Sequence, residues 1–273
     1  MIDLHLHTTA SDGLLAPEPL VERVAAAGVT IMAVTDHDTV AGLDRAEAAA
    51  RARAIRFVPG IEITAVEEGR DVHVLGYFFD RANRPLAAFL ETQRADRRRR
   101  IGEMTARLAA LGIPIDADDL LARHAGRAIG RPAIAAALMR DGHVATIAEA
   151  FDRFLGTGGA AFVPRTGAPV RDVARVIRDA GGLASIAHPG LLRDPALLDR
   201  IAADRGSIDA VEAFHTDHDA GTTARLLAHA DSRGLLVTGG SDFHGDDAGR
   251  AVGLGRIALP PEWFDRLAGG CAA

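Results

Sequence analysis

The chain has 273 residues, of which 48% are hydrophobic and 25% charged, a balance that excludes a disordered chain and allows one large α/β domain or two domains. Its formal net charge of -6 argues against a protein that coats nucleic acid broadly, so any nucleotide should bind at a local site. Its single cysteine, Cys271, excludes an intrachain disulfide and a zinc site built from thiolates.

The sequence carries no signal for a membrane or for export. It begins with a predicted strand rather than a basic region followed by an apolar run, and it has no uninterrupted apolar stretch of about 18 residues. We therefore expect a cytoplasmic protein without a membrane partner or an obligate protein partner. All basic residues are arginine, whose planar guanidinium suits bidentate phosphate recognition.

The first stretch of the chain places two imidazoles on one side of a predicted strand. Side chains at i and i+2 of a strand share a face, so His5 and His7 project together, away from Leu4 and Leu6. Neutral imidazole is a common metal ligand, but two such histidines can equally be satisfied by ordinary hydrogen bonds. This pair alone leaves both interpretations open.

Strands and helices then alternate on either side of a helical segment. Apolar runs at residues 31–34, 56–61, 71–79, 183–187, 208–212 and 235–238 predict strands, and helical patterns follow most of them. This order predicts parallel strands covered by helices, with functional groups at the carboxyl ends of the strands of a barrel. Residues 84–160 lack a strand-like run and predict a helical insertion, so the barrel should comprise residues 1–83 and 161–273. We expect the arginine run at residues 94–100 to form a solvated helix face, with part of it facing an anionic substrate as the alternative.

Polar residues recur where the predicted strands end. Asp36 and His37 follow the second strand, Glu62 follows the third, His188 follows a later one, and Asp242 and His244 follow the last. Histidines scattered through a core would not repeatedly follow apolar strands, whereas ligands of a metal in a parallel barrel must lie there. His73 fits less well because it lies inside its strand. The candidate metal ligands are His5, His7, Asp12, His37, Glu62, His73, His188, Asp242 and His244.

Nine donors exceed the three or four protein ligands of a single zinc-like ion and suffice for two or three divalent ions. Clustered ions of this kind assist phosphoryl displacement, with a carboxylate such as that of Glu62 bridging them. Mixed histidine and carboxylate donors favour manganese, iron or zinc over calcium or magnesium, and we expect manganese.

These motifs together resemble those of the polymerase and histidinol phosphatase (PHP) family of metal-dependent phosphoesterases. The resemblance rests on His5-Leu6-His7, Ser11-Asp12-Gly13, Thr35-Asp36-His37-Asp38, Gly60-Ile61-Glu62, His73, Ala187-His188-Pro189-Gly190 and Gly240-Ser241-Asp242-Phe243-His244. Their order is most similar to that of the small members that dephosphorylate nucleoside 3',5'-bisphosphates and trim short RNA from the 5' end.

The resemblance implies a distorted (β/α)7 TIM-like barrel with three ions. It places His5, His7, Glu62 and Asp242 on one ion, Glu62, His73 and His188 on a second, and Asp12, His37 and His244 on a third. It implies hydrolysis of a small phosphorylated substrate, a nucleotide or short oligonucleotide, with Asp36, His37, Glu62, His188 and His218 as catalytic residues. His218 would contact the substrate phosphate or protonate the leaving group, while its neighbour His215 is interpreted as a loop residue.

The sequence departs from the family pattern at two places in or near the insertion. In Ile129-Gly130-Arg131-Pro132-Ala133 a histidine usually follows the proline, and the segment that ends at Val163-Pro164-Arg165 normally carries a lysine. Arg131 and Arg165 remain as phosphate-binding residues, with a helix-surface charge as the alternative for either. For His124, His143 and His229 we expect surface or capping roles.

Three alternative functions remain. A histidinol-phosphate or other small-molecule phosphatase would need no site for a nucleobase. A hydrolase of C–N bonds would typically use a carboxylated lysine, which this chain lacks. A non-enzymatic metal-binding module is disfavoured because no expected ligand position is missing.

Overall fold

The computed structural model describes residues 1–124, 127–192, 194–204, 206–246 and 254–270. Seven strands form one sheet whose order follows the chain: β1 (Ile2–Asp3), β2 (Ile31–Val34), β3 (Arg56–Glu67), β4 (Arg70–Tyr77), β5 (Leu183–Ile186), β6 (Ala210–His215) and β7 (Leu236–Gly240). The sheet curls until the segments after β1 and β7 meet, where Leu4 N donates to Gly239 O and Asp242 N donates to His5 O. The predicted distorted, TIM-like barrel is confirmed.

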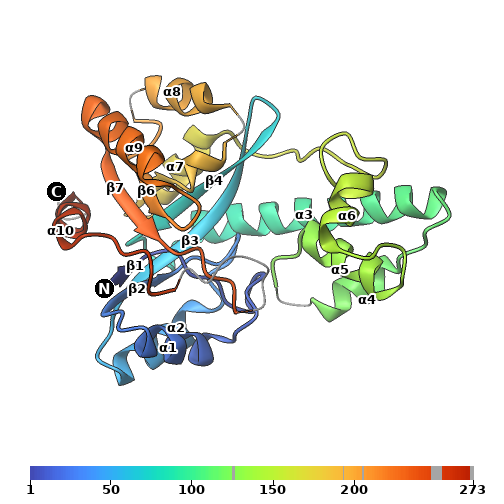
Figure 1. The fold of residues 1–273 in the computed structure, drawn as a ribbon, viewed down its shortest axis with the longest axis horizontal. Helices are drawn as coiled ribbons and strands as arrows, with labels where there is room; N and C mark the ends of the chain where they lie inside the picture. The colour runs from blue at the N-terminus through green and yellow to red at the C-terminus, as the bar shows by residue number, and fades with distance from the viewer. Residues whose placement is uncertain (125–126, 193, 205, 247–253, 271–273) are drawn as a thin grey trace.

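Helices surround this barrel on the outside (Figure 1). They are α1 (Pro17–Ala26), α2 (Leu43–Ala52), α7 (Val170–Asp179), α8 (Pro195–Ala203), α9 (Ala220–Arg233) and α10 (Pro261–Gly270), with a short 3-10 turn η2 (Pro189–Leu191) after β5. Proline starts α1, α8 and α10, where a missing N–H costs no helical hydrogen bond. Their apolar faces pack on the strands in one buried cluster, which includes Leu20, Leu43, Ile177 and Phe264.

The prediction of purely parallel strands is wrong for β4, which runs antiparallel to both β3 and β5. Its cause is a two-residue hairpin turn at Glu68 and Gly69, both of which have positive φ, at 48° and 73°. Such a turn matches the twist of paired strands and joins β3 to β4 without a helix. Because β4 runs antiparallel, its first residues lie at the end of the barrel where the other strands finish, so His73 lies inside a strand and still at that end.

A helical segment projects from the barrel on the right of Figure 1. It contains α3 (Arg84–Ala110), α4 (Ala117–Arg123), α5 (Arg131–Arg140), α6 (Ile147–Ala150) and a π-helical turn η1 (Phe151–Leu155). The long helix α3 belongs to two cores. Leu86 and Leu90 pack in the barrel core, whereas Ile101, Met104 and Leu108 pack in a separate cluster with α5 and η1. The structure thus ties the insertion to the barrel through one continuous helix.

The arginine run of α3 is not uniformly solvated, so that prediction is wrong in part. Arg98 and Arg99 are exposed, but Arg97 and Arg100 are only 7% and 5% exposed. They continue the buried stripe of the helix, in which Leu90, Gln93, Arg97, Arg100 and Met104 follow at helical spacing. The physical reason is that both guanidinium groups find polar partners where the helix crosses from barrel to insertion.

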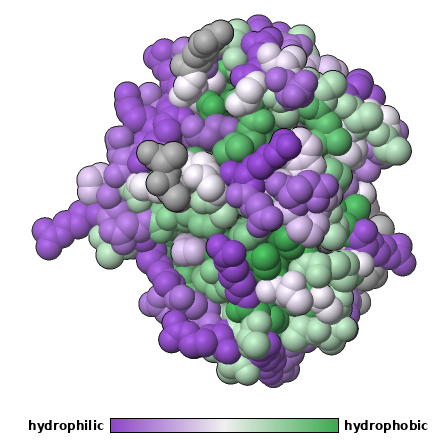
Figure 2. Space-filling model, turned by 90° about the vertical axis from the view of Figure 1, so that its left-hand side faces the viewer, coloured by the Kyte–Doolittle hydropathy of each residue, from purple (hydrophilic) through white to green (hydrophobic). Residues whose placement is uncertain are grey.

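The barrel face that lies on the left of Figure 1 mixes hydrophilic and hydrophobic residues over its surface (Figure 2). Among the described residues, no helix is both long and apolar enough to cross a membrane. Cys271 lies outside the described residues.

Candidate metal centre

The nine predicted ligands come from six of the strands or the segments just after them, and the structure brings all nine side chains together. His5 and His7 follow β1, His37 follows β2, His188 follows β5, and Asp242 and His244 follow β7. Parallel bridges between Leu6 and Phe243 and between His37 and Glu62 hold these extensions in register. Glu62 and His73 lie within β3 and β4, on the hairpin that completes the barrel.

Glu62 lies at the middle of the cluster and is almost fully buried. Its Oε2 lies 3.3 Å from His5 Nε2, 3.2 Å from His7 Nε2 and 3.3 Å from His37 Nδ1. The other oxygen, Oε1, lies 2.8 Å from His73 Nδ1 and 3.2 Å from His188 Nε2. The two carboxylate oxygens therefore face two different sets of imidazoles, as a carboxylate that bridges two cations would.

Two further carboxylates complete the cluster. Asp242 Oδ1 lies 3.4 Å from His5 Nε2 and 3.2 Å from His7 Nε2, so it faces the same space as Glu62 Oε2. Asp12 lies on the opposite side of His7, with Oδ1 3.3 Å from His244 Nε2 and Oδ2 3.7 Å from His37 Nε2. His244 is oriented by Nδ1, which donates to Asp242 O at 2.9 Å and leaves Nε2 to face Asp12.

The cluster fits divalent cations. The side chain of His7 is fully buried, yet neither ring nitrogen has a hydrogen-bond partner, and His37 Nδ1 also lacks one. Buried polar atoms are rarely left in this state in native proteins, and a cation at each nitrogen lone pair would remove the cost. The donor atoms of His5, His7, Glu62 and Asp242 lie within 4.8 Å of one another, as do those of His7, Asp12, His37 and His244. Imidazole and carboxylate donors suit manganese, iron or zinc.

The electrostatics of the centre also favour cations. Burial lowers the pKa of His7, but the carboxylates of Asp242 and Glu62, each 3.2 Å from Nε2, outweigh burial and raise this pKa to about 10. Burial lowers the pKa of His37 to about 3, so this imidazole is neutral with a lone pair available. Burial raises the pKa of Asp242, but His5 and its other neighbours outweigh it and hold the pKa well below the usual range. Protons and metal ions compete for the same negative site.

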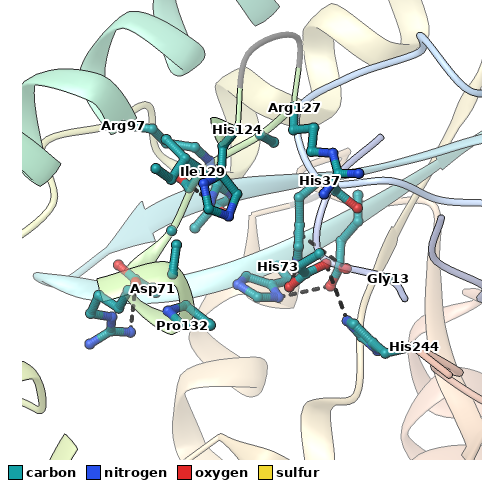
Figure 3. Close-up of a pocket in the computed structure, with 18 of the residues that line it drawn as sticks. Gly13, His37, Asp71, His73, Arg97, His124, Arg127, Ile129, Pro132 and His244 are labelled. Carbon is teal, nitrogen blue, oxygen red and sulfur yellow. Dashed lines mark hydrogen bonds and ion pairs between the residues drawn. The ribbon is translucent and has the colours of Figure 1, made fainter. Parts of the chain in front are cut away.

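The cluster opens into a cavity of about 520 Å³ between the barrel and the insertion. His37, His73 and His244 lie on one side of this cavity, and Asp71, Arg97 and Pro132 lie across from them (Figure 3). Arg100, Arg127, Arg131 and Arg165 also line the cavity, and Arg131 and Arg165 lie near Asp71. The cavity therefore has a metal-binding end and an arginine-rich end.

Arg165 is the most unusual of these arginines. Its side chain is 6% exposed, and its Nε and Nη1 lack a hydrogen-bond partner. The nearest carboxylate oxygens are Asp71 Oδ1 at 3.7 Å and Asp38 Oδ2 at 4.0 Å. Burial, helped by the neighbouring Arg97, lowers the pKa of Arg165 to about 10, which still leaves it charged at neutral pH. Buried, charged and incompletely paired, it is prepared to bind an anion.

Arg131 and Ala133 line the same cavity from the start of α5. The guanidinium of Arg131 lies 5.7 Å from the centroid of the Phe151 ring, and its Nη2 lies 3.5 Å from Asp71 Oδ2. Ala133 presents only a methyl group to the cavity. His124 also lines the cavity, and its Nδ1 lies 2.8 Å from Leu120 O, as expected of a capping residue.

Two residues expected to be catalytic do not lie at the cavity. Asp36 is fully buried, and its carboxylate accepts hydrogen bonds from Thr8 N, Thr8 Oγ1 and Ser11 Oγ at 2.6–2.8 Å. Both ring nitrogens of His218 are engaged by the backbone, Nδ1 with Ala213 O at 3.0 Å and Nε2 with Gly190 N at 3.1 Å. Hydrogen bonding to the protein thus engages both side chains away from the cavity, and their catalytic roles stay predictions from the sequence.

Sequence reasoning missed two buried residues at the end of β6. Glu212 contacts His5, with Nδ1 donating to Oε1 at 2.9 Å. His215 is 1% exposed, and its Nε2 lies 3.5 Å from Asp242 Oδ2, so it is more than a loop residue. The available signal was a charged residue in the apolar run Val211-Glu212-Ala213, at the same strand end as the predicted ligands.

Comparisons with known proteins agree with this geometry. The family model described as the PHP domain matches residues 3–154. The chain is 37% identical over 248 residues to a 5'-3' exoribonuclease of Haemophilus influenzae, with 89% of each chain covered. It is 36% identical over 260 residues to the 3',5'-nucleoside bisphosphate phosphatase of Chromobacterium violaceum, with 92% of this chain and 90% of that protein covered.

A solved structure gives the same result for the whole fold. The crystal structure of a predicted metal-dependent phosphoesterase from Bifidobacterium adolescentis superposes with a TM-score of 0.86 at 34% identity, covering 98% of this chain and 95% of the other. The match includes the insertion as well as the barrel, because nearly all of both chains is covered. The resemblance noted in the sequence is therefore confirmed, and the chain belongs to the PHP family of metal-dependent phosphoesterases.

Proposed function

We propose that the protein hydrolyses the 3'-phosphomonoester of a nucleoside 3',5'-bisphosphate to give the nucleoside 5'-monophosphate, and also cleaves 5'-end phosphodiesters of short RNA. The observation that carries this proposal is a single cavity with two ends that attract anions, the metal centre and the buried guanidinium of Arg165. A bisphosphate presents one phosphoryl group to each end. The named activities of the two relatives, on RNA and on nucleoside bisphosphates, agree with this substrate class.

The proposed ligand set holds three divalent ions, manganese first and iron or zinc as alternatives. His5, His7, Glu62 and Asp242 would hold one ion, Glu62, His73 and His188 the second, and Asp12, His37 and His244 the third. When bound, such ions supply an activated water and neutralise charge on the phosphoryl oxygens. The chain contributes the geometry, because every imidazole is fixed by a strand end or by a carboxylate neighbour.

At the other end, Arg165 would donate to the second phosphate through the N–H groups that have no partner in the protein. Arg131 would assist from α5, where Phe151 and Asp71 limit its movement. Arg97 has a different task, because its Nε donates to Asp38 Oδ2 at 2.5 Å and its Nη2 donates to Thr64 Oγ1 at 3.0 Å. Because these barrel residues engage its guanidinium, Arg97 holds α3 against the barrel at the cavity.

The helical insertion, proposed as residues 84–160, would cover the nucleoside and exclude bulk water from the reacting phosphate. It brings Arg131 to the cavity, and Arg165 follows directly after it in the chain. Arg165 supplies the cation in this segment, because the chain has no lysine. A monophosphate such as histidinol phosphate would leave Arg165 unpaired, which favours the bisphosphate over this alternative. A cytoplasmic location stays a prediction from the sequence.

A panel of phosphoesters tests the proposal. Protein loaded with Mn²⁺ is assayed for phosphate release from adenosine 3',5'-bisphosphate, adenosine 3'-monophosphate and histidinol phosphate, and for mononucleotide release from a 5'-phosphorylated dinucleotide. We expect the highest kcat/KM for the bisphosphate, with adenosine 5'-monophosphate as product and no turnover in EDTA. Equal kcat/KM for histidinol phosphate and the bisphosphate would reject the assigned substrate class.

A further inference from the structure

Strand β6 is followed by none of the nine proposed ligands, yet it brings a carboxylate directly behind them. Glu212, near the carboxyl end of β6, is fully buried. Both of its oxygens are used. Oε1 accepts from His5 Nδ1 at 2.9 Å, and Oε2 accepts from His188 N at 2.7 Å. One carboxylate therefore contacts two proposed ligands that belong to two different ions.

The contact with His5 decides which ring nitrogen can bind a cation. A hydrogen bond to a carboxylate requires the proton on Nδ1, so the lone pair lies on Nε2. That nitrogen faces the centre, 3.3 Å from Glu62 Oε2 and 3.4 Å from Asp242 Oδ1. Carboxylate partners of this kind orient metal-binding histidines and raise their basicity. Glu212 thus holds His5 in the tautomer that the first ion needs.

The contact with His188 acts on the backbone instead. His188 has φ 32° and ψ 52°, a left-handed conformation that costs free energy in a residue with a side chain. Its N–H donates to Glu212, while its Nε2 lies 3.2 Å from Glu62 Oε1. The hydrogen bond offsets the strained conformation that aims this imidazole at the second ion.

An ion between His5, Glu212 and His215 is the competing explanation, because their donor atoms also lie within 4.8 Å of one another. The 2.9 Å between His5 Nδ1 and Glu212 Oε1 is a hydrogen-bond distance. His215 Nδ1 accepts from Asp217 N at 3.1 Å, so its lone pair is engaged and Nε2 carries the proton. His215 therefore offers no free lone pair to a cation, which favours hydrogen bonding over a further ion.

We infer that Glu212 is a positioning residue shared by two ions of the centre, the one bound by His5, His7, Glu62 and Asp242 and the one bound by Glu62, His73 and His188. It fixes the tautomer of His5 and the backbone of His188 at once. The third proposed group, Asp12, His37 and His244, has no contact with Glu212 among the described interactions. This inference rests on the metal centre of the proposed function.

Replacement of Glu212 by glutamine tests the inference, because an amide offers one acceptor and one donor and cannot accept from both N–H groups. Glu67→Gln is the matched control: Glu67 also lies on a barrel strand and accepts a backbone N–H, from Val170 at 3.0 Å, but lies outside the cluster. Mn²⁺ binding is titrated calorimetrically, and bound metal per chain is counted after dialysis. Circular dichroism and thermal unfolding in EDTA report the fold of each metal-free variant.

We expect Glu212→Gln to weaken Mn²⁺ binding at two sites by about 10- to 100-fold and to retain one ion with wild-type affinity. Glu67→Gln should bind as the wild type does. Asp12→Asn should give the reciprocal pattern, losing the ion that Glu212→Gln keeps. Glu212→Asp, which retains two acceptor oxygens, should bind with intermediate affinity, and it decides the question if the glutamine variant does not fold.

Failure of the inference and failure of the proposed function give different results. Wild-type protein that binds fewer than two Mn²⁺ ions per chain contradicts the proposed centre itself. Wild-type protein that binds its ions, with unchanged affinity and stoichiometry in Glu212→Gln or in a folded Glu212→Asp, overturns the role of Glu212 alone. A drop in thermal stability without a change in Mn²⁺ binding also overturns it, because that result describes a purely structural residue.

Discussion

The two ends of the cavity are built in different ways. At the barrel end, the proposed ligands lie on strands or on short extensions whose backbone hydrogen bonds set the register, such as Asp242 N to His5 O at 2.9 Å. At the insertion end, the arginines come from α3, α5 and the segment after η1, and side-chain ion pairs hold them in place. Arg97 donates to Asp38 Oδ2 at 2.5 Å, and Arg131 and Arg165 lie near Asp71.

The two kinds of construction suit two different functions, metal binding at the barrel end and substrate recognition at the insertion end. Positions fixed by strand register vary little, which suits a metal centre whose ligand atoms must converge within a few ångströms. Positions fixed by guanidinium side chains depend on which carboxylate is near, so substitution can change them without disturbing the barrel. We therefore expect changes at the barrel end to affect turnover and changes at the insertion end to affect substrate affinity and choice.

Removal of a ligand at the barrel end should have the largest effect. Asp242→Ala is expected to lower kcat for adenosine 3',5'-bisphosphate by about 10³-fold or more, because several kcal/mol of transition-state stabilisation disappear and each 1.36 kcal/mol is a factor of ten. Phosphate release with Mn²⁺ present measures the effect. Asp44→Ala, at a surface carboxylate of α2, is the control and should keep wild-type kcat. Undiminished turnover in Asp242→Ala would show that catalysis does not depend on the metal centre.

The ion pair between Arg97 and Asp38, which joins the two ends, should matter most for stability. Asp38 is fully buried, so Arg97→Met leaves a buried carboxylate without its closest partner and should lower the free energy of unfolding by about 3–5 kcal/mol. Urea unfolding followed by circular dichroism measures this loss. Arg98→Met, one position along the same helix but at an exposed arginine, should change stability by less than about 0.5 kcal/mol. If both substitutions lower the free energy of unfolding equally, the ion pair between Arg97 and Asp38 does not stabilise the fold.

Loss of the incompletely paired guanidinium of Arg165 should change affinity more than turnover. Arg165→Met is expected to raise KM for adenosine 3',5'-bisphosphate by about 10- to 100-fold, since hydrogen bonds to charged groups contribute about 1.5–3 kcal/mol. KM for adenosine 3'-monophosphate should change little, because that substrate has no second phosphate. Steady-state kinetics with both substrates provide the comparison, and Arg98→Met serves again as the control. An equal rise for both substrates shows that Arg165 does not recognise the second phosphate.

The last expected effect concerns pH in the metal-free protein. The folded-state pKa of His7, about 10, lies above its usual value of 6.5, so its protonation stabilises the fold fully below about pH 6.5 and ceases to do so as the pH rises through about 10. The thermal midpoint in EDTA should therefore fall between pH 7 and pH 10. Mn²⁺ should flatten this dependence because the ion replaces the proton. His7→Asn should lose the His7 contribution in EDTA, and a slope unchanged by this substitution contradicts the assignment.

Much of the candidate centre follows from local sequence. Strand patterns end next to His37, His188 and Asp242, and parallel strands must place such residues at one end of a barrel. The position of His73 could not be understood in this way, because the type of turn at Glu68 and Gly69 makes β4 antiparallel and reverses its direction. A two-residue hairpin with one glycine is a weak signal inside an otherwise alternating strand and helix pattern.

Residues whose partners lie far away in the chain were harder to assign. The sequence predicts that Arg97 belongs to a solvated arginine run, whereas the structure places it beside Asp38, 59 positions earlier in the chain. The family resemblance implied catalytic roles for Asp36 and His218, but hydrogen bonds with the first loop and with the backbone engage both side chains. Glu212 looked unremarkable because its partner His5 lies 207 positions away.

The sequence by itself determined the family, the barrel with its insertion, and which side chains are candidates for the metal centre, because strand periodicity and motif order are local properties. Only the tertiary structure decided which polar residues reach the cavity and which are held by the protein. That decision depends on burial and on partners that the fold brings together. A carboxylate or imidazole whose acceptors and donors are satisfied is structural, whereas one left unsatisfied, like His7 or Arg165, is available to a ligand.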